Sequence, residues 1–155
     1  MGSVTYPHGG VERRLNESFV AFKPQIDLNQ ELAKKYEVHW TPGIVILDEM
    51  ENMHYRAFGY HPPELCEHLL DIGRGMTHFD LGRYREAAEA FTRVTEDRTR
   101  SPLTPEALYW LGVARYKTGD KSAMTQVWSR LLDEHPQSLW AQKAGFIRPG
   151  ATAAA

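Results

Sequence analysis

From about Asp71 onward the chain repeats its own pattern at a fixed interval, and this restricts the possible folds more than any other feature. Five positions recur 37 residues later: Gly75, Gly82, Ala87, Phe91 and Val94 correspond to Gly112, Gly119, Met124, Trp128 and Leu131. Self-similarity at a period of about 20–50 residues is typical of stacked supersecondary units. With helical spacing of the apolar residues, the repeat predicts one helix pair over 71–80 and 83–96 and a second over 105–118 and 121–135.

The spacing inside each unit resembles the tetratricopeptide repeat. A small residue is followed seven positions later by glycine, then by Ala or Met five further on and by an aromatic residue four beyond that. In that family the pattern forms a helix-turn-helix of about 34 residues, so three additional residues fit in the loop 97–104. Thr104 is expected to cap the third helix, with Pro105 in its first turn, and Asp120 to cap the fourth. Ser138 begins a last helix, which covers the end of the array because two repeats alone rarely bury a continuous core.

Stacked helix pairs form a concave surface lined by the first helix of each pair, and such a surface suits a peptide. The predicted lining consists of Arg74, His78, Tyr109, Val113, Tyr116 and Lys117. The aromatic residues at helical spacing, Tyr109, Trp110, Tyr116, Trp128 and Trp140, are expected to lie mostly in the core. The repeats therefore predict a protein or peptide partner. We assign 71–146 to two repeats plus a capping helix and 147–155 to a disordered tail.

Residues 1–70 show a mixed helix and strand pattern. Helical turns are predicted at 11–16, a strand at 19–23, a helix at 31–36, and strands at 44–47 and 53–58 joined by a polar turn at 49–52. A further helix begins at Pro62 or Pro63. Proline has no N–H to give to a sheet ladder, so Pro42 just before a buried strand indicates a special turn. The Thr41–Pro42 bond is a candidate for the cis form.

This order of elements, together with a set of short motifs, resembles the thioredoxin-like fold. The motifs are T-Y-P at 5–7, V-x-x-x-L-N-x-x-F-V at 11–20, L-A-x-x-Y-x-V at 32–38, Thr41–Pro42, L-D at 47–48 and F-G-Y at 58–60. The resemblance implies an incomplete α/β domain with a mixed sheet over residues 1–70. It also implies that Pro42 is cis and that the loop Trp40-Thr41-Pro42 offers its backbone to an extended substrate peptide. Gly43 departs from the family, which usually has threonine after this proline.

The first strand of that family and its C-x-x-C motif would precede the position of Met1, and both are absent from the sequence. In the family this strand lies between the strands that correspond to 19–23 and 44–47. Without that strand, the backbone N–H and C=O groups on the facing edges of the other two would be unpaired, which is costly when they are buried. Three alternatives avoid this cost. The two strands pair directly, a second chain supplies a strand in a homodimer, or the chain is a shortened version of a longer protein. Gly73 and Gly75 are expected to mark a bend between the two parts.

The composition argues against several kinds of partner and site. Lys and Arg total 18 against 20 acidic residues, a net charge of -2, which favours neither nucleic acid nor an anionic membrane. Because the chain has no apolar run of about 18 residues and no apolar signal segment, we expect a cytoplasmic protein. Seven histidines and one cysteine lack a ligand spacing, so no metal and no cofactor are expected. The pairs Arg13/Arg14 and Glu64/Glu67 are expected on solvated faces.

Cys66 is the only candidate nucleophile in the sequence. On an apolar helix face a thiol is inert, so no catalytic residue is assigned. The preferred interpretation is a redox-inactive thioredoxin-like and tetratricopeptide-like adaptor. The alternative is a thiol-disulfide oxidoreductase of the thioredoxin family, whose C-x-x-C would lie upstream of Met1 and whose first cysteine would attack as a thiolate.

Overall fold

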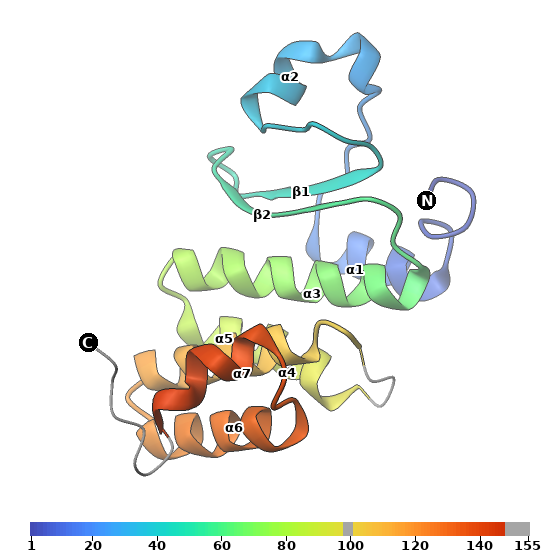
Figure 1. The fold of residues 1–155 in the computed structure, drawn as a ribbon. Helices are drawn as coiled ribbons and strands as arrows, with labels where there is room; N and C mark the ends of the chain where they lie inside the picture. The colour runs from blue at the N-terminus through green and yellow to red at the C-terminus, as the bar shows by residue number, and fades with distance from the viewer. Residues whose placement is uncertain (98–100, 148–155) are drawn as a thin grey trace. The chain divides into compact units, whose positions relative to one another are not determined.

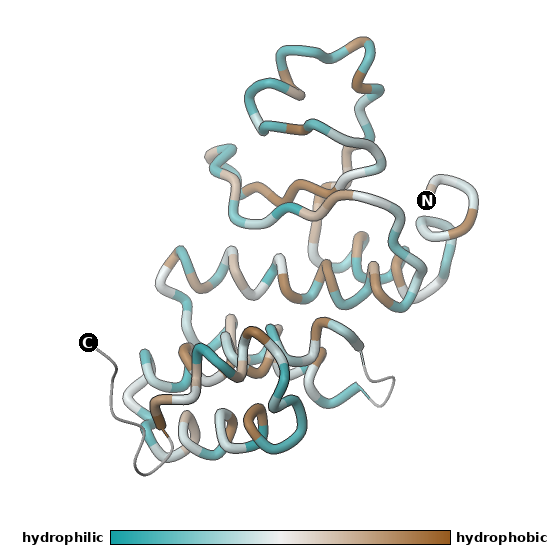
Figure 2. Tube along the Cα trace, in the orientation of Figure 1, coloured by the Kyte–Doolittle hydropathy of each residue, from teal (hydrophilic) through white to brown (hydrophobic). Residues whose placement is uncertain are grey.

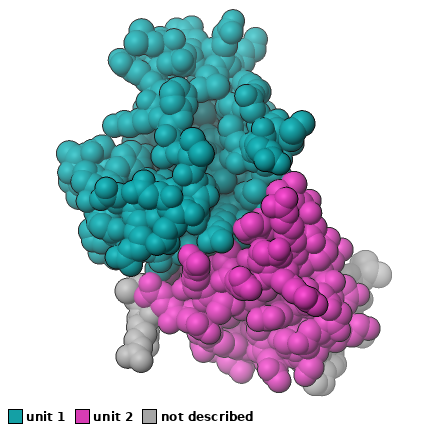
Figure 3. Space-filling view, turned by 180° about the vertical axis from the view of Figure 1, so that it is seen from behind, with its two compact units in different colours: residues 1–77 teal, residues 78–155 magenta. Residues whose placement is uncertain are grey.

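The computed structural model describes residues 1–97 and 101–147, and the chain forms two compact units (Figure 3). Unit 1 comprises Met1–Thr77 and unit 2 comprises His78–Ala155. A single helix, α3 (Pro63–Asp80), contains the division between them. The expected division at residue 71 falls inside this helix. Of the expected loop 97–104 and tail 147–155, residues 98–100 and 148–155 lie outside the described residues.

Unit 1 contains a two-stranded antiparallel sheet, β1 (Gly43–Leu47) and β2 (Met53–Phe58), as the sequence predicts for these two segments. The turn between them is organised by the carboxylate of Asp48. Its Oδ1 accepts the backbone N–H groups of Met50 at 2.9 Å and Asn52 at 2.8 Å, and its Oδ2 accepts Asn52 Nδ2 at 2.9 Å. These donors, together with His54 Nε2 at 3.1 Å, hold the pKa of Asp48 well below its ordinary value, with the Asn52 side chain contributing most.

Two further helices of unit 1 precede the sheet, α1 (Gly9–Ser18) and α2 (Gln30–Lys35), with a short 3-10 turn over Ile26–Leu28 before α2. The core of this unit joins α1, β1 and α3 through Val11, Ile46, Cys66 and Leu70. In Figure 1 the two strands run side by side, and Figure 2 shows that the apolar residues of β1 form one continuous stretch. Ile46 of β1 is therefore buried between residues of α1 and α3.

Arg14 ties α1 to α3 and corrects the expectation that it lies on a solvated face. Its Nε donates to Asp71 Oδ2 at 2.8 Å and its Nη1 pairs with Glu67. The Asp71 side chain is only 3% exposed. An arginine so placed is required by the buried carboxylate, because an unpaired charge in a protein interior is strongly unfavourable.

Gly73 allows the sheet to approach α3 closely. A Cβ at this position would lie 2.0 Å from Ile46 Cδ1 and 3.3 Å from Tyr55 Cβ. The helix runs without interruption from Pro63 to Asp80, so the glycine serves packing where the sequence predicted a bend.

The expected strand at 19–23 is wrong. In the structure this segment is extended chain without strand pairing, Val20 is fully exposed and Phe22 is 77% exposed. In the described sheet, of order β1-β2, neither strand pairs with it. Aromatic and β-branched residues favour a strand only where a neighbouring strand and a packing surface are present. Among the described residues, the broader mixed sheet implied by the thioredoxin-like resemblance is accordingly not found.

Unit 2 consists of helices whose positions agree with the predicted repeat. They are α4 (Tyr84–Glu96), α5 (Thr104–Lys117), α6 (Lys121–Glu134) and α7 (Leu139–Ala144), followed by a 3-10 turn over Gly145–Ile147. Helix α5 packs against α4, α6 and α7. The core between α5, α6 and α7 is built from Leu108, Trp128, Leu131 and Leu132 with Ala141 and Ala144.

The turns before α4 and α6 have the same hydrogen bonds, shifted by the repeat. Gly82 and Gly119 have φ of 75° and 86°, the left-handed region in which glycine carries no Cβ penalty. In the first turn the N–H of Arg83 donates to His78 O, and in the second the N–H of Asp120 donates to Arg115 O. The six-to-one bond and the positive φ are those of a Schellman cap, which ends a helix and satisfies its last carbonyls.

The expected caps have mixed outcomes. Asp120 accepts Ala123 N–H at 2.9 Å and Ser138 accepts Ala141 N–H at 3.0 Å, as predicted. The Thr104 cap is wrong, since the helix begins at Thr104 itself, its N-cap is Leu103 and Thr104 Oγ1 makes no hydrogen bond. Pro105 does stand in the first turn, where its missing N–H costs nothing.

Replacing Gly112 tests the close approach of α6 to α5 at Trp128. A Cβ there would lie 2.2 Å from Trp128 Nε1. Alanine improves helix propensity by about 1 kcal/mol, but the overlap forces a rigid indole to move. We expect Gly112→Ala to lower the free energy of unfolding by about 1–3 kcal/mol in urea denaturation followed by circular dichroism. Gly145, with nothing within 4 Å of its would-be Cβ and φ of -60°, is the matched control. An equal effect of Gly145→Ala would contradict this account.

Candidate functional site: the face of α5 and α7

The predicted lining residues of α5 divide into a packed pair and an exposed pair. Tyr109 and Val113 pack against the core of unit 2. Tyr116 is 49% exposed and Lys117 is exposed, with Lys117 Nζ 5.9 Å from the centroid of the Tyr84 ring. Spacings of three and four residues place these side chains along one stripe of the helix. The exposed end of that stripe is therefore the part available to a ligand.

The two remaining lining residues lie in different units. His78 is half-buried at the start of unit 2. Arg74 belongs to unit 1, where its Nη1 donates to Ser18 Oγ at 3.2 Å. Within unit 2 only the four α5 residues share one helix stripe, and we describe the site from these.

An aromatic cluster extends the site from α5 onto α7. The Tyr109 ring lies 5.2 Å from that of Trp140, and the Trp110 ring lies 6.3 Å from Trp140 and 5.4 Å from Phe79. Trp110 and Trp140 are half-buried, so each presents part of its ring to solvent. Helical spacing predicted that most of these aromatic residues are core. Trp128 is buried, Tyr109, Trp110 and Trp140 are half-buried, and Tyr116 is exposed.

The sequence did not single out two charged groups of this region, Lys143, which lies over the rings, and Glu106 on α5. Lys143 Nζ lies 4.2 Å from the Trp140 ring centroid and 6.0 Å from that of Tyr109. Burial raises the pKa of Glu106, and the nearby charge of Lys143 opposes that rise. The i,i+3 spacing of Trp140 and Lys143 in the sequence indicates that these two side chains can meet. The sequence does not indicate that Lys143 lies near Glu106, because that depends on how α5 and α7 pack.

The loop Trp40-Thr41-Pro42 lies in unit 1. Trp40 is 69% exposed, Thr41 is exposed and Pro42 is half-buried. The Thr41–Pro42 peptide bond is cis. Pro42 O accepts the N–H of Gly59 at 2.8 Å, which joins the loop to the F-G-Y turn where Gly59 has φ of 98°. The exposed tryptophan is the feature of this loop that a ligand can reach.

Cys66 is 1% exposed and belongs to the core of unit 1. Burial, with a smaller contribution from the neighbouring carboxylate of Glu67, raises the pKa of its thiol to about 11. Among the described residues, His, Cys, Asp and Glu side chains do not gather in groups that would hold a metal ion. Nor does any described helix combine the length and apolar character that crossing a membrane requires.

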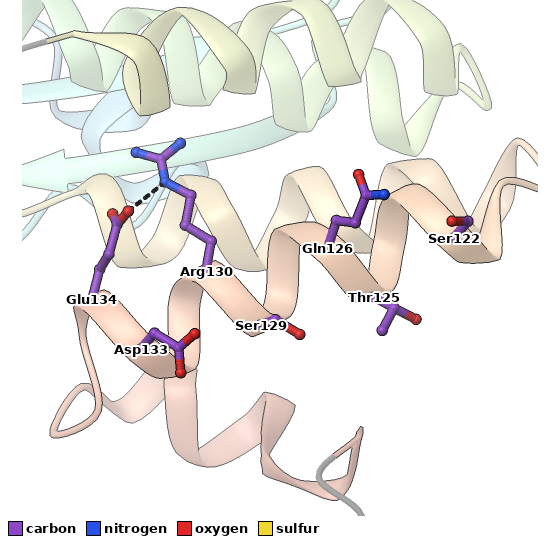
Figure 4. Close-up of a pocket in the computed structure, with 7 residues that line it drawn as sticks. All are labelled: Ser122, Thr125, Gln126, Ser129, Arg130, Asp133 and Glu134. Atoms are coloured by element: carbon purple, nitrogen blue, oxygen red, sulfur yellow. Dashed lines mark hydrogen bonds and ion pairs between the residues drawn. The ribbon is translucent and has the colours of Figure 1, made fainter.

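The outer face of α6 carries a shallow depression of about 700 Å³ (Figure 4). Its lining is polar and comes from one helix: Ser122, Thr125, Gln126, Ser129, Arg130, Asp133 and Glu134. Arg130 Nε donates to Glu134 Oε1 at 2.9 Å and Arg130 Nη2 to Thr95 O at 3.0 Å. The arginine thus joins α6 to the end of α4. Without an opposing wall, this depression is a solvated helix face and not a ligand site.

The tetratricopeptide repeat family model matches residues 72–138. This match and the paired helices confirm the repeat-like part of the chain. No curated protein and no solved structure matches the sequence. The comparisons therefore add no support to the thioredoxin-like resemblance of residues 1–70.

The reactivity of Cys66 tests the account of its burial. A rise of the thiol pKa from 9.0 to about 11 lowers the thiolate fraction near pH 8 by roughly 100-fold. We expect a disulfide reagent to modify the native protein at least about 100-fold more slowly than the unfolded chain. The control is Ser129→Cys, on the exposed face of α6, in a Cys66→Ala background. Native Cys66 reacting within tenfold of this exposed thiol would contradict the account.

Proposed function

We propose that this chain is a protein-interaction module whose binding surface is the face of α5 and α7 in unit 2. The proposal rests on the tetratricopeptide repeat match together with the exposed Tyr116 and Lys117 on α5. Helix-pair repeats bind peptides on the face lined by the first helix of each pair. Half-exposed aromatic rings supply binding energy at low entropic cost, since few torsions are lost on contact.

The loop at Trp40 is a second proposed contact surface. An exposed tryptophan with an indole N–H suits an interface, because one end is apolar and the other donates a hydrogen bond. Arg74 belongs to unit 1 and His78 to unit 2. We propose that each makes polar contacts with a bound partner on the surface of its own unit. An adaptor with two such surfaces joins two partners or two segments of one partner.

We further propose that the chain as written does not catalyse thiol-disulfide exchange. Exchange begins with attack by a thiolate, and the only cysteine is a buried thiol of raised pKa. The oxidoreductase alternative requires two cysteines that this sequence does not contain.

Site-specific photocrosslinking tests the α5 face directly. The photoreactive residue benzoylphenylalanine replaces Tyr116 in one variant and Ser129, on the outer face of α6, in the other. Both positions are exposed. We expect discrete protein adducts at position 116, at least about tenfold above position 129, and competition by an excess of unmodified protein.

Equal adducts at the two positions, or adducts that excess unmodified protein does not reduce, would contradict the proposed face. Circular dichroism of both variants controls for folding, since each replaces a surface side chain.

The open edge of β1 favours a proposal about assembly. Within the described residues β1 pairs only with β2, and its sequence Ile-Val-Ile-Leu is strongly β-forming. An unpaired apolar edge is a template for another strand. We propose that a second copy of the chain supplies it, because two identical edges pair about a two-fold axis.

Light scattering after size-exclusion chromatography tests this assembly. We expect a mass near twice 17.7 kDa at high protein concentration. Val45→Lys places a charge on the sheet face opposite the buried Ile46 and should give a monomer. Met50→Lys, at an exposed position in the hairpin turn, is the matched control and should remain dimeric. A monomeric wild-type protein at all concentrations would refute the dimer.

A further inference from the structure

A lysine side chain of unit 2 rests on an aromatic surface that two helices build. Lys143, on α7, places its Nζ 4.2 Å from the Trp140 centroid and 6.0 Å from the Tyr109 centroid. Trp140 belongs to the same helix, but Tyr109 comes from α5. The faces of Trp and Tyr attract a cation within about 6 Å through their quadrupoles. The surface is therefore chemically suited to an ammonium group.

The rings of this surface are ordered by packing against the core of unit 2. Tyr109 stacks on Trp128 with centroids 5.6 Å apart and an interplanar angle of 15°. Trp128 is buried and its Nε1–H donates to the Tyr109 carbonyl at 3.0 Å. Tyr109 in turn lies 5.2 Å from Trp140. Because packing already orders these rings, a ligand loses little free energy in ordering them.

A carboxylate stands on the same helix as Tyr109, close enough to Lys143 to feel its charge. Glu106 lies one turn before Tyr109 and Trp110 on α5 and is half-buried. Burial disfavours its charged form, and the charge of Lys143 favours it. A first-turn glutamate also gains from the helix dipole, but a solvent-exposed position would serve that role equally well. Its partial burial near a cation indicates an acceptor for an ammonium.

We propose that Glu106, Tyr109 and Trp140 form a binding site for a lysine side chain of a partner protein, and that Lys143 occupies this site in the free protein. This inference rests on the proposed interaction function and names the chemistry of its ligand. The carboxylate disfavours an acidic peptide, and the aromatic faces disfavour an anion. Lys143 is an exposed residue, so an incoming lysine can displace it.

Displacement predicts a gain of affinity when Lys143 is removed. An intramolecular occupant competes at a high effective concentration. We expect Lys143→Gln to bind a fluorescein-labelled peptide of alternating lysine and glycine about 3–30-fold more tightly than the wild type, the range of one cation–aromatic contact. Adding Glu106→Gln or Trp140→Leu to Lys143→Gln should cancel that gain.

Three controls separate this site from general charge effects. Lys121→Gln removes the same charge from the exposed start of α6 and should leave affinity within about twofold of the wild type. A peptide with norleucine in place of lysine should show no gain with Lys143→Gln. Circular dichroism and thermal unfolding confirm that each variant is folded.

Equal gains for Lys143→Gln and Lys121→Gln, no gain for either, or a gain for the norleucine peptide, would overturn the lysine site. The crosslinking experiment at Tyr116 separates this failure from failure of the interaction function. Crosslinks that persist without any lysine-peptide effect refute the site and leave the function standing. A lysine-dependent gain without crosslinks at 116 supports the site and refutes the proposed face at Tyr116.

Discussion

The contact between Gly112 and Trp128 is the one on which the architecture of unit 2 depends. Because Gly112 has no Cβ, the indole of Trp128 lies against the backbone of α5 and donates its Nε1–H to the Tyr109 carbonyl at 3.0 Å. A helix carbonyl has a second lone pair, so it accepts this bond without losing its own helical partner. The contact sets how closely α5 and α6 approach, and it orders the Tyr109 ring by stacking.

The surface that we propose for binding is built outward from that contact. Tyr109 stacks on Trp128 and lies at an interplanar angle of 41° to Trp140, so the rings of the proposed lysine site also join α5 to α7. Val113 continues the packed part of the stripe, and Tyr116 at the end of α5 is left exposed. Core packing and the proposed binding surface thus share side chains.

Unit 1 uses a glycine in a similar way but with a weaker sequence signal. Gly73 lets Ile46 of β1 reach α3, and Arg14 neutralises the buried Asp71 of the same helix. Neither role is visible from spacing, because each depends on a partner 27 or 57 residues away. The strand expected at 19–23 failed for the same reason. Its local propensity was right for a strand, but in the structure it pairs with neither strand of the sheet and its Val20 and Phe22 are exposed.

The sequence by itself determined the elements whose causes are local. The 37-residue period located the helix pairs, and it located the equivalent turns at Gly82 and Gly119, since a positive φ selects glycine whatever lies around it. The residue types at Asp120 and Ser138 also predicted two helix caps, in which donor and acceptor are three residues apart. Only the tertiary structure decided which aromatic residues are core and which are exposed. It alone brought Glu106, Tyr109 and Lys143 together, because contacts between α5 and α7 arise from packing and not from spacing along the chain.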